Sequence, residues 1–181
     1  MTSPALYRAE MPKIRPSRIR GARTVIRPAT LDDVDRLVAW HADPEVARYW
    51  DGASLTREEV AAHLARPSVD PWIVEAGGPP VGYLQSWRED DPPLRGGLDM
   101  YLVSAARGRG LGPDAARALA GALVDAGWAS VTADPYVWNE HAVAAWQRAG
   151  FEVAAECPAD SGHDAPWLLM RFSPGPGCGG D

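Results

Sequence analysis

The hexapeptide RGRGLG at residues 107–112 combines residue types and spacing that point to anion chemistry. It follows an apolar stretch expected to be a strand (97–103) and precedes an alanine-rich stretch expected to be a helix (113–126). Glycines let a ligand approach the main chain, a helix N-terminus favours negative charge, and arginine can bind phosphate through two hydrogen bonds. The loop therefore predicts a phosphate or pyrophosphate site. The alternative is a glycine-rich surface turn.

This loop differs from two common phosphate-binding motifs. A P-loop would need Gly-Lys-Ser/Thr, and the spacing of Gly108, Gly110 and Gly112 does not fit G-x-G-x-x-G. The residues expected to contact the anion are Arg107, Gly108, Arg109, Gly110, Leu111 and Gly112.

A carboxylate, Asp99, stands in the middle of the preceding strand, with Leu98 and Met100 on the opposite face. Burying an unpaired carboxylate costs several kcal/mol, roughly, so an acid at this position is expected to have a function. An ion pair with Arg95 is the structural alternative. Asp134 ends the next predicted strand and is expected to face the same cleft.

Further residues are candidates to line that cleft. Gln85 and Trp87 alternate on one face of the predicted strand 81–87. An aromatic ring and a carboxylate, Trp50 and Asp51, suit an aminosugar or another cation. Glu89 begins an acidic turn that either binds distal amines or is simply solvated, and Asp160 or Asp164 is expected to close the far side.

Charge is distributed unevenly along the 181 residues. Residues 1–28 hold seven of the 18 basic side chains and one acid, so residues 29–181 carry a net charge of −12. An acidic body repels nucleic acid and favours cationic partners. No apolar run reaches the ~20 residues of a membrane span, and two cysteines are too few for a disulfide framework. We expect a cytoplasmic protein, monomeric or homodimeric, that binds neither membrane nor nucleic acid.

Hydrophobic periodicity and turn residues predict one α/β domain over residues 23–172, with a flexible basic leader (1–22) and a disordered tail (173–181). The sheet is expected to be mixed, with about six to seven strands and about four flanking helices. The expected strands are 24–28, 71–76, 81–87, 97–103, 129–134, 151–156 and 166–172, and the helices 31–42, 57–66, 113–126 and 139–149, with a short helical piece near 45–49.

Two separated segments resemble the GNAT N-acetyltransferase superfamily. RGRGLG is similar to its R/Q-x-x-G-x-G/A loop, and NEHAVAAWQRAGF (139–151) to its N-x-x-A-x-x-x-Y-x-x-x-G-F segment. The resemblance implies a GNAT fold with a V-shaped splay between two strands, and acetyl-CoA as cosubstrate without a metal. It also implies cofactor contacts at the loop and at Leu102, Val103, Asn139, Ala142 and Trp146.

Within the superfamily, three segments most resemble the aminoglycoside 6'-N-acetyltransferases: GYLQSW (82–87), RGGLDMYL (95–102) and TADPYVWN (132–139). The resemblance implies direct transfer of an acetyl group to the 6'-amine of a polycationic aminoglycoside, with Asp99 orienting and deprotonating the amine. Alternatives are acetylation of a protein N-terminus, of a siderophore-type lysine or of another small amine, and a non-catalytic CoA-binding module.

The chain departs from the family pattern at two positions. Trp146 stands where the family usually has a tyrosine that protonates the leaving thiolate, and an indole N–H does not transfer its proton at neutral pH. Pro113 follows the loop directly and is expected at the first helical position, where it would remove one amide from the phosphate site.

Overall fold

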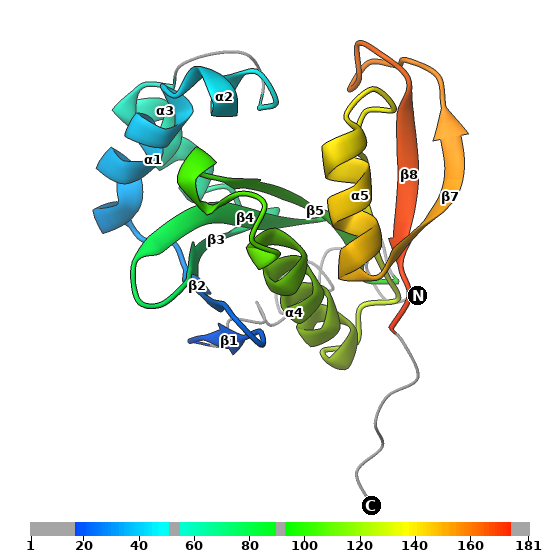
Figure 1. The fold of residues 1–181 in the computed structure, drawn as a ribbon, viewed down its shortest axis with the longest axis horizontal. Helices are drawn as coiled ribbons and strands as arrows, with labels where there is room; N and C mark the ends of the chain where they lie inside the picture. Colours follow the sequence, from blue (N-terminus) through cyan, green and yellow to red (C-terminus); the bar gives the residue numbers. More distant parts are fainter. Residues whose placement is uncertain (1–16, 51–54, 90–92, 175–181) are drawn as a thin grey trace, which may run out of the picture.

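The structure is a computed structural model that describes residues 17–50, 55–89 and 93–174. Its strands form a single mixed sheet in the order β1-β2-β3-β4-β5-β6-β8-β7 (Figure 1). The strands are β1 (Ile19–Arg20), β2 (Val25–Pro28), β3 (Val69–Glu75), β4 (Pro80–Arg88), β5 (Arg95–Leu102), β6 (Ser130–Ala133), β7 (Phe151–Cys157) and β8 (Trp167–Phe172). The α-helices are α1 (Val34–His41), α2 (Pro44–Ala47), α3 (Arg57–Leu64), α4 (Leu111–Asp125) and α5 (Glu140–Ala149).

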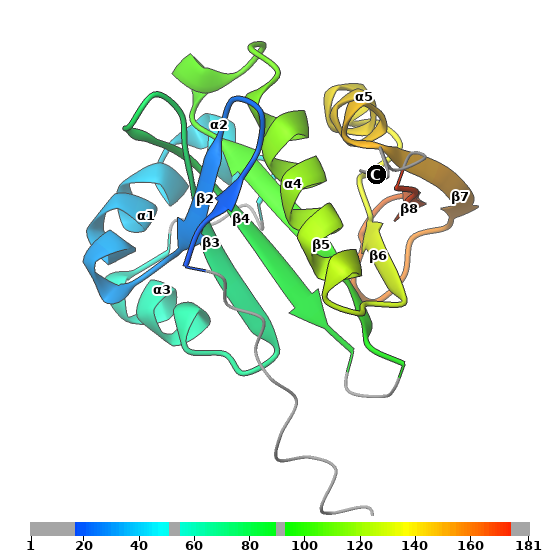
Figure 2. The same ribbon diagram turned by 90° about the horizontal axis from the view of Figure 1, so that it is seen from below.

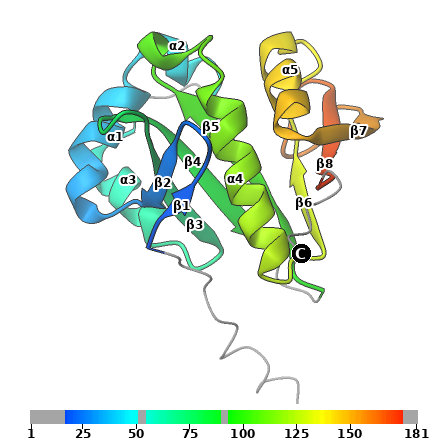
Figure 3. The same cartoon turned by 60° about the horizontal axis from the view of Figure 1, so that its bottom comes forward.

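Helices cover both faces of the sheet, and strand alternation decides which side chains they bury. Tyr83 on β4 packs with α1 and α3, whereas its neighbour Leu84 packs with α4. Figures 2 and 3 show α4 along β5 on one face and α1 and α3 beyond β2 and β3. The predicted α/β fold is confirmed, with eight strands rather than six to seven.

The additional strand, β1, comes from the segment predicted to be leader. Ile19 and Arg20 pair antiparallel with β2, and Gly21 N donates to Thr24 O to close the turn. Part of the segment expected to be a flexible leader (1–22) therefore pairs with the sheet. The sequence did not predict this strand, because an edge strand of two residues buries too few side chains to require an apolar pattern.

Two helix starts also differ from the prediction. The first helix opens with a 3₁₀ turn, Leu31–Asp33, and Leu31 is exposed. Helix α4 begins at Leu111, so Pro113 is its third residue and not its first. Proline is tolerated there because the first four amides of a helix have no intrahelical acceptor. Helix α3 begins with a capping box formed by Thr56 and Glu59.

The sheet opens between β5 and β6, as the resemblance implies. These parallel strands pair only at three positions, the last being Gly97 with Thr132. Beyond it β5 continues to Leu102 along β4, while β6 continues beside β8. The V-shaped splay is therefore formed by the second half of β5 and the end of β6.

Candidate active site

The glycine-rich loop ends at the N-terminus of α4, as predicted. Gly108 and Gly110 both have positive φ, 71° and 74°, and Gly110 is the N-cap residue. Among the described residues, α4 has no side chain that caps its first amides. This leaves the helix end suited to an external anion.

Gly112, the second residue of α4, brings the helix close to β5. A Cβ at this position would lie 3.2 Å from Met100 Cε and 3.6 Å from Leu102 Cδ1. The contact with Met100 would be tight, so Gly112 allows the helix to pack against the splayed part of β5. Leu111, also predicted as a cofactor contact, is buried in the same core.

The two arginines of the loop point to different places. Arg107 donates from Nε to Leu102 O at 2.9 Å and from Nη2 to Glu45 O at 3.0 Å. Its guanidinium therefore joins the end of β5 to α2. Arg109 is exposed, so it is the loop arginine that remains available to an anion.

A third arginine, Arg23, reaches this loop from the β1–β2 turn. Its Nη1 donates to Arg109 O at 2.6 Å and lies close to Gly110. Arg23 was not predictable as a neighbour of the loop, because 86 residues separate it from its partner. The sequence offered one indication of its role, a basic side chain in a segment without hydrophobic periodicity.

Asp114, in the first turn of α4, holds the segment that carries Arg23. Its carboxylate accepts hydrogen bonds from the backbone amides of Ala22, Arg23 and Thr24 and from the Thr24 hydroxyl. Burial raises the pKa of Asp114, but these hydrogen bonds outweigh it and hold the pKa below its usual range. Asp114 thus connects β1, β2 and the loop in its ionised form.

Asp99 lies opposite Gln85 in the β4–β5 register, on the face that α1 and α3 cover. Gln85 Nε2 donates to Asp99 Oδ2 at 2.7 Å, and Gln85 is buried. Trp87, one alternation further, lies against Gly97 on the same face. The structure brings these three predicted residues together.

Arg95, proposed as the structural partner of Asp99, forms an exposed ion pair with Glu89. Glu89 is therefore part of a solvated pair at the turn after β4.

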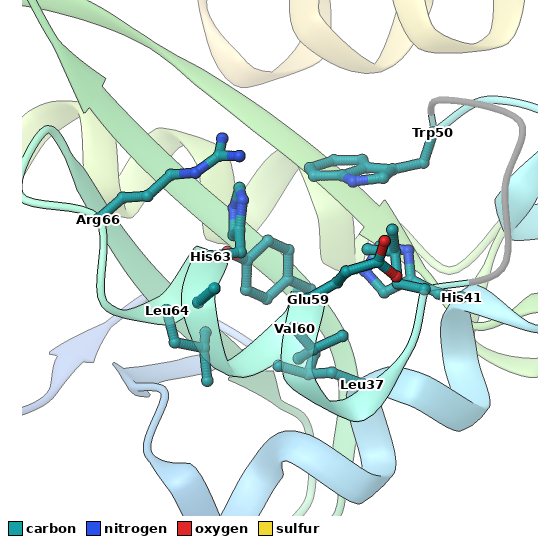
Figure 4. A pocket seen from close by; sticks show the side chains of 11 residues that line it. Leu37, His41, Trp50, Glu59, Val60, His63, Leu64 and Arg66 are labelled. Carbon is teal, nitrogen blue, oxygen red and sulfur yellow. The ribbon is translucent and has the colours of Figure 1, made fainter.

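Trp50 follows α2 and covers part of the sheet face on which Asp99 and Gln85 lie. Its indole packs edge-on against Tyr83 and Tyr101, with ring centroids 5.7 Å and 5.2 Å away. A pocket of about 300 Å³ opens beside it between α1, α3 and β4. Figure 4 shows His63 and Arg66 on one side of this pocket and Trp50 on the other. The neighbouring candidate Asp51 lies outside the described residues.

Asp134 follows β6 and is bound by the β7–β8 loop. His163 Nε2 lies 3.3 Å from Asp134 Oδ2, and His163 Nδ1 lies 3.2 Å from Asp160 Oδ1. Asp160 also accepts from Trp167 Nε1, so it organises this loop. Asp164 is exposed beside it.

The α5 residues named by the resemblance have structural roles. Asn139 caps α5, because its side chain accepts from Ala142 N at 3.2 Å. Trp146 is buried in the core and packs edge-on against Phe151, with ring centroids 5.0 Å apart. Its expected cofactor contact is not supported by this position, since a core side chain does not reach a ligand.

In the part of the chain that the structure describes, no group of three His, Cys, Asp or Glu side chains could hold a metal ion. Within the same residues, no helix combines the length and apolar character needed to cross a bilayer.

Residues 23–152 match the Acetyltransferase (GNAT) domain family. The chain belongs to this family. This GNAT acetyltransferase is 30% identical over 146 residues to the aminoglycoside N(6')-acetyltransferases type 1 of Klebsiella pneumoniae and Serratia marcescens, which covers 70% of the chain and 73% of each relative. The predicted superfamily and the likeness to aminoglycoside 6'-N-acetyltransferases are confirmed, and so is the prediction of an enzyme.

Solved structures agree with this assignment. The GNAT acetyltransferase superimposes on AAC(6')-Ib in complex with paromomycin and acetyl-CoA with a TM-score of 0.73 at 28% identity, covering 84% of this chain and 94% of the other. RimL, a ribosomal L7/L12 α-N-protein acetyltransferase, gives a TM-score of 0.74 at 15% identity, covering 85% and 96%. At that identity the likeness to RimL shows the fold alone.

Proposed function

We propose that this GNAT acetyltransferase transfers an acetyl group from acetyl-CoA to the 6'-amine of an aminoglycoside by direct attack within a ternary complex. One observation carries the proposal. On β5, the strand that borders the splay, the carboxylate of Asp99 accepts a hydrogen bond from the buried amide of Gln85. The aminoglycoside N-acetyltransferases to which the chain is similar support the substrate class.

The splay and the loop fit acetyl-CoA. Val103 N bonds to Val81 O on β4, and Thr132 Oγ1 donates to Gly96 O from the other side. Because successive residues of a strand direct their main-chain groups to opposite sides, residues 98, 100 and 102 direct theirs toward the opening. An extended pantetheine arm has amides that would bond there. Its pyrophosphate would lie at the α4 N-terminus, near Arg109 and Arg23.

Asp99 supplies what the amine needs. A primary amine is mostly protonated at neutral pH and attacks only after it loses that proton. A carboxylate attracts the cation, orients it and accepts the proton as the nitrogen attacks the thioester carbon. Gln85 Nε2 donates to Oδ2 of Asp99 and so fixes the orientation of the carboxylate that would receive the amine.

The strand end and the leaving group complete the reaction. Backbone amides of β5 that face the opening would polarise the thioester carbonyl. Collapse of the tetrahedral adduct breaks the C–S bond, and the CoA thiolate leaves with the electron pair. Trp146 takes no part in protonating it, because it is buried and its indole keeps its proton.

The walls around Asp99 suit a polycationic sugar. We include Trp50 and Trp87 for their aromatic rings and Asp134 as a carboxylate at the end of β6. We include Glu89 and Asp164 as outer acidic groups because both are exposed. The cofactor residues that we retain are Leu102, Val103, Gly108, Arg109, Gly110, Gly112 and Ala142.

Release of CoA thiol in the presence of different amines tests this function. The panel contains aminoglycosides, a lysine derivative and a peptide with a free N-terminus. We expect release with aminoglycosides, and a product heavier by one acetyl group that NMR places on the 6'-nitrogen. Release only with the peptide or the lysine derivative would replace the proposed substrate class.

A further inference from the structure

His63 on α3 is connected to Asp99 through the amide of Gln85. The imidazole Nε2 of His63 lies 2.7 Å from Gln85 Oε1, and Gln85 Nε2 lies 2.7 Å from Asp99 Oδ2. The Tyr83 hydroxyl donates a second hydrogen bond to Gln85 Oε1, at 3.1 Å. Because Gln85 is buried, these partners decide which way its amide is turned.

The two ends of a glutamine amide have nearly the same size and opposite hydrogen-bonding character. With its NH₂ group toward Asp99, Gln85 donates to the carboxylate. Turned around, it would place a carbonyl oxygen against a carboxylate oxygen, and two acceptors repel. A carbonyl oxygen only accepts, so the short contact requires a hydrogen on Nε2 of His63.

The second donor keeps its proton as well. Burial raises the pKa of the Tyr83 phenol, and the charge of Asp99 raises it further. Two donors, one from α3 and one from β4, therefore hold Oε1 of Gln85 away from Asp99.

We propose that His63 is a positioning residue for acetyl transfer: its Nε2–H holds Gln85 in the orientation that donates to Asp99. The proposal rests on the proposed function, in which Asp99 is the base. His63 acts on Asp99 through Gln85, so its effect disappears when the amide of Gln85 is removed. A hydrogen bond to a carboxylate favours its charged form. Losing the hydrogen bond from Gln85 would therefore favour the protonated form of Asp99, which cannot accept the proton of the amine.

Two substitutions separate the hydrogen bond from the packing of the imidazole. His63→Leu removes the donor and keeps a side chain of similar bulk. His63→Gln keeps an N–H at a similar reach from the backbone. We expect His63→Leu to lower kcat about tenfold with the KM for acetyl-CoA unchanged, and His63→Gln to restore most of the loss.

The same substitution in a Gln85→Leu background completes a double-mutant cycle. There, His63→Leu should cause no further fall in kcat. An equal fall in both backgrounds would overturn the positioning role, and so would a His63→Gln variant as slow as His63→Leu. Melting temperatures of all variants show whether each is folded.

An NMR measurement on the unmodified protein reads the hydrogen directly and needs no turnover. Long-range ¹H–¹⁵N spectra of the histidine rings, with His63 assigned from the His63→Gln variant, should show hydrogen on Nε2. A ring with hydrogen on Nδ1 alone would overturn the proposal. If the wild-type protein releases no thiol with any amine, the proposed function fails and the positioning role fails with it. If the wild-type protein is active but the effects of His63→Leu and Gln85→Leu on kcat are additive, the positioning role of His63 is rejected and the proposed function stands.

Discussion

At position 99, a substitution can separate charge from shape. Asp99→Asn keeps an oxygen that accepts from Gln85 Nε2 but removes the charge and the basicity. General-base catalysis typically contributes about 10²–10⁴-fold, so we expect kcat to fall by that factor. The KM for acetyl-CoA should hardly change. Steady-state kinetics with both substrates varied measures the two effects.

The same kinetics distinguish a base from an anchor. If Asp99 only attracts the cation, Asp99→Asn raises the KM for the amine and leaves kcat near normal. A base also contributes an ionisation to the pH profile of the wild-type rate, and that ionisation should be missing from the variant. A profile shared by both proteins would reject the base role.

The alternation of residues along a strand was sufficient to predict the site residues on β4 and β5, but not the side chains from other elements that contact them. Alternation along β4 predicted that Gln85 and Trp87 share a face, and both were expected to line the cleft that contains Asp99. His63 lies on helix α3 and not on this pair of strands, and its contact with Gln85 spans 22 residues of sequence. The direction of Arg107 was also hidden, because a loop arginine has several acceptors within reach and only the fold decides among them.

The loop before α4 is the element expected to bind the cofactor, and Gly110 is its most sensitive position. Gly110→Val puts a β-branched residue at a φ of 74° and next to Arg23. We expect the dissociation constant of acetyl-CoA to rise at least about tenfold, or about 1.4 kcal/mol. Isothermal titration calorimetry measures the change.

Gly127 provides a matched control at the other end of α4. Its φ is 94°, and a Cβ there would meet nothing within 4 Å. Gly127→Val should therefore cause comparable backbone strain without changing the affinity for acetyl-CoA. Equal affinities in the two variants would contradict the assignment of the loop.

Asp114 connects the β1–β2 turn to α4, so Asp114→Asn tests whether that turn supports the loop. Its pKa lies below the usual range in the folded protein, so the carboxylate stabilises the fold above about pH 4. This contribution is lost as the pH falls through the folded pKa. We expect a lower melting temperature and weaker acetyl-CoA binding at pH 7, and a difference in melting temperature that shrinks in acid.

A melting difference that stays constant with pH would mean that Asp114 acts through packing and not through its charge. Unchanged acetyl-CoA affinity in Asp114→Asn would separate the turn from the cofactor site.

Element types were predictable because long apolar periods and capping residues are local signals. The edges were not. Strand β1 depends on pairing with β2 and on four hydrogen bonds to Asp114, about 90 residues away. Helix α4 starts two residues early because a glycine at positive φ turns the chain into the helix, a conformation that composition alone does not specify.

For the whole molecule, the acidic body is expected to strengthen binding of a polycation. Residues 29–181 carry a net charge of −12, and the Debye length is about 8 Å at physiological ionic strength. The KM for an aminoglycoside should therefore rise with salt, and it should rise less for an aminoglycoside with fewer amines. A KM that stays flat from low to high salt would contradict an acidic cleft.

The central claim is acetyl transfer to the 6'-amine, and a matched pair of aminoglycosides tests it most directly. The two compounds differ only at position 6', where one has an amine and the other a hydroxyl. With acetyl-CoA and the wild-type enzyme, we predict thiol release with the amine compound and none above background with the hydroxyl compound. Equal release with both compounds, or release with neither, would contradict the claim.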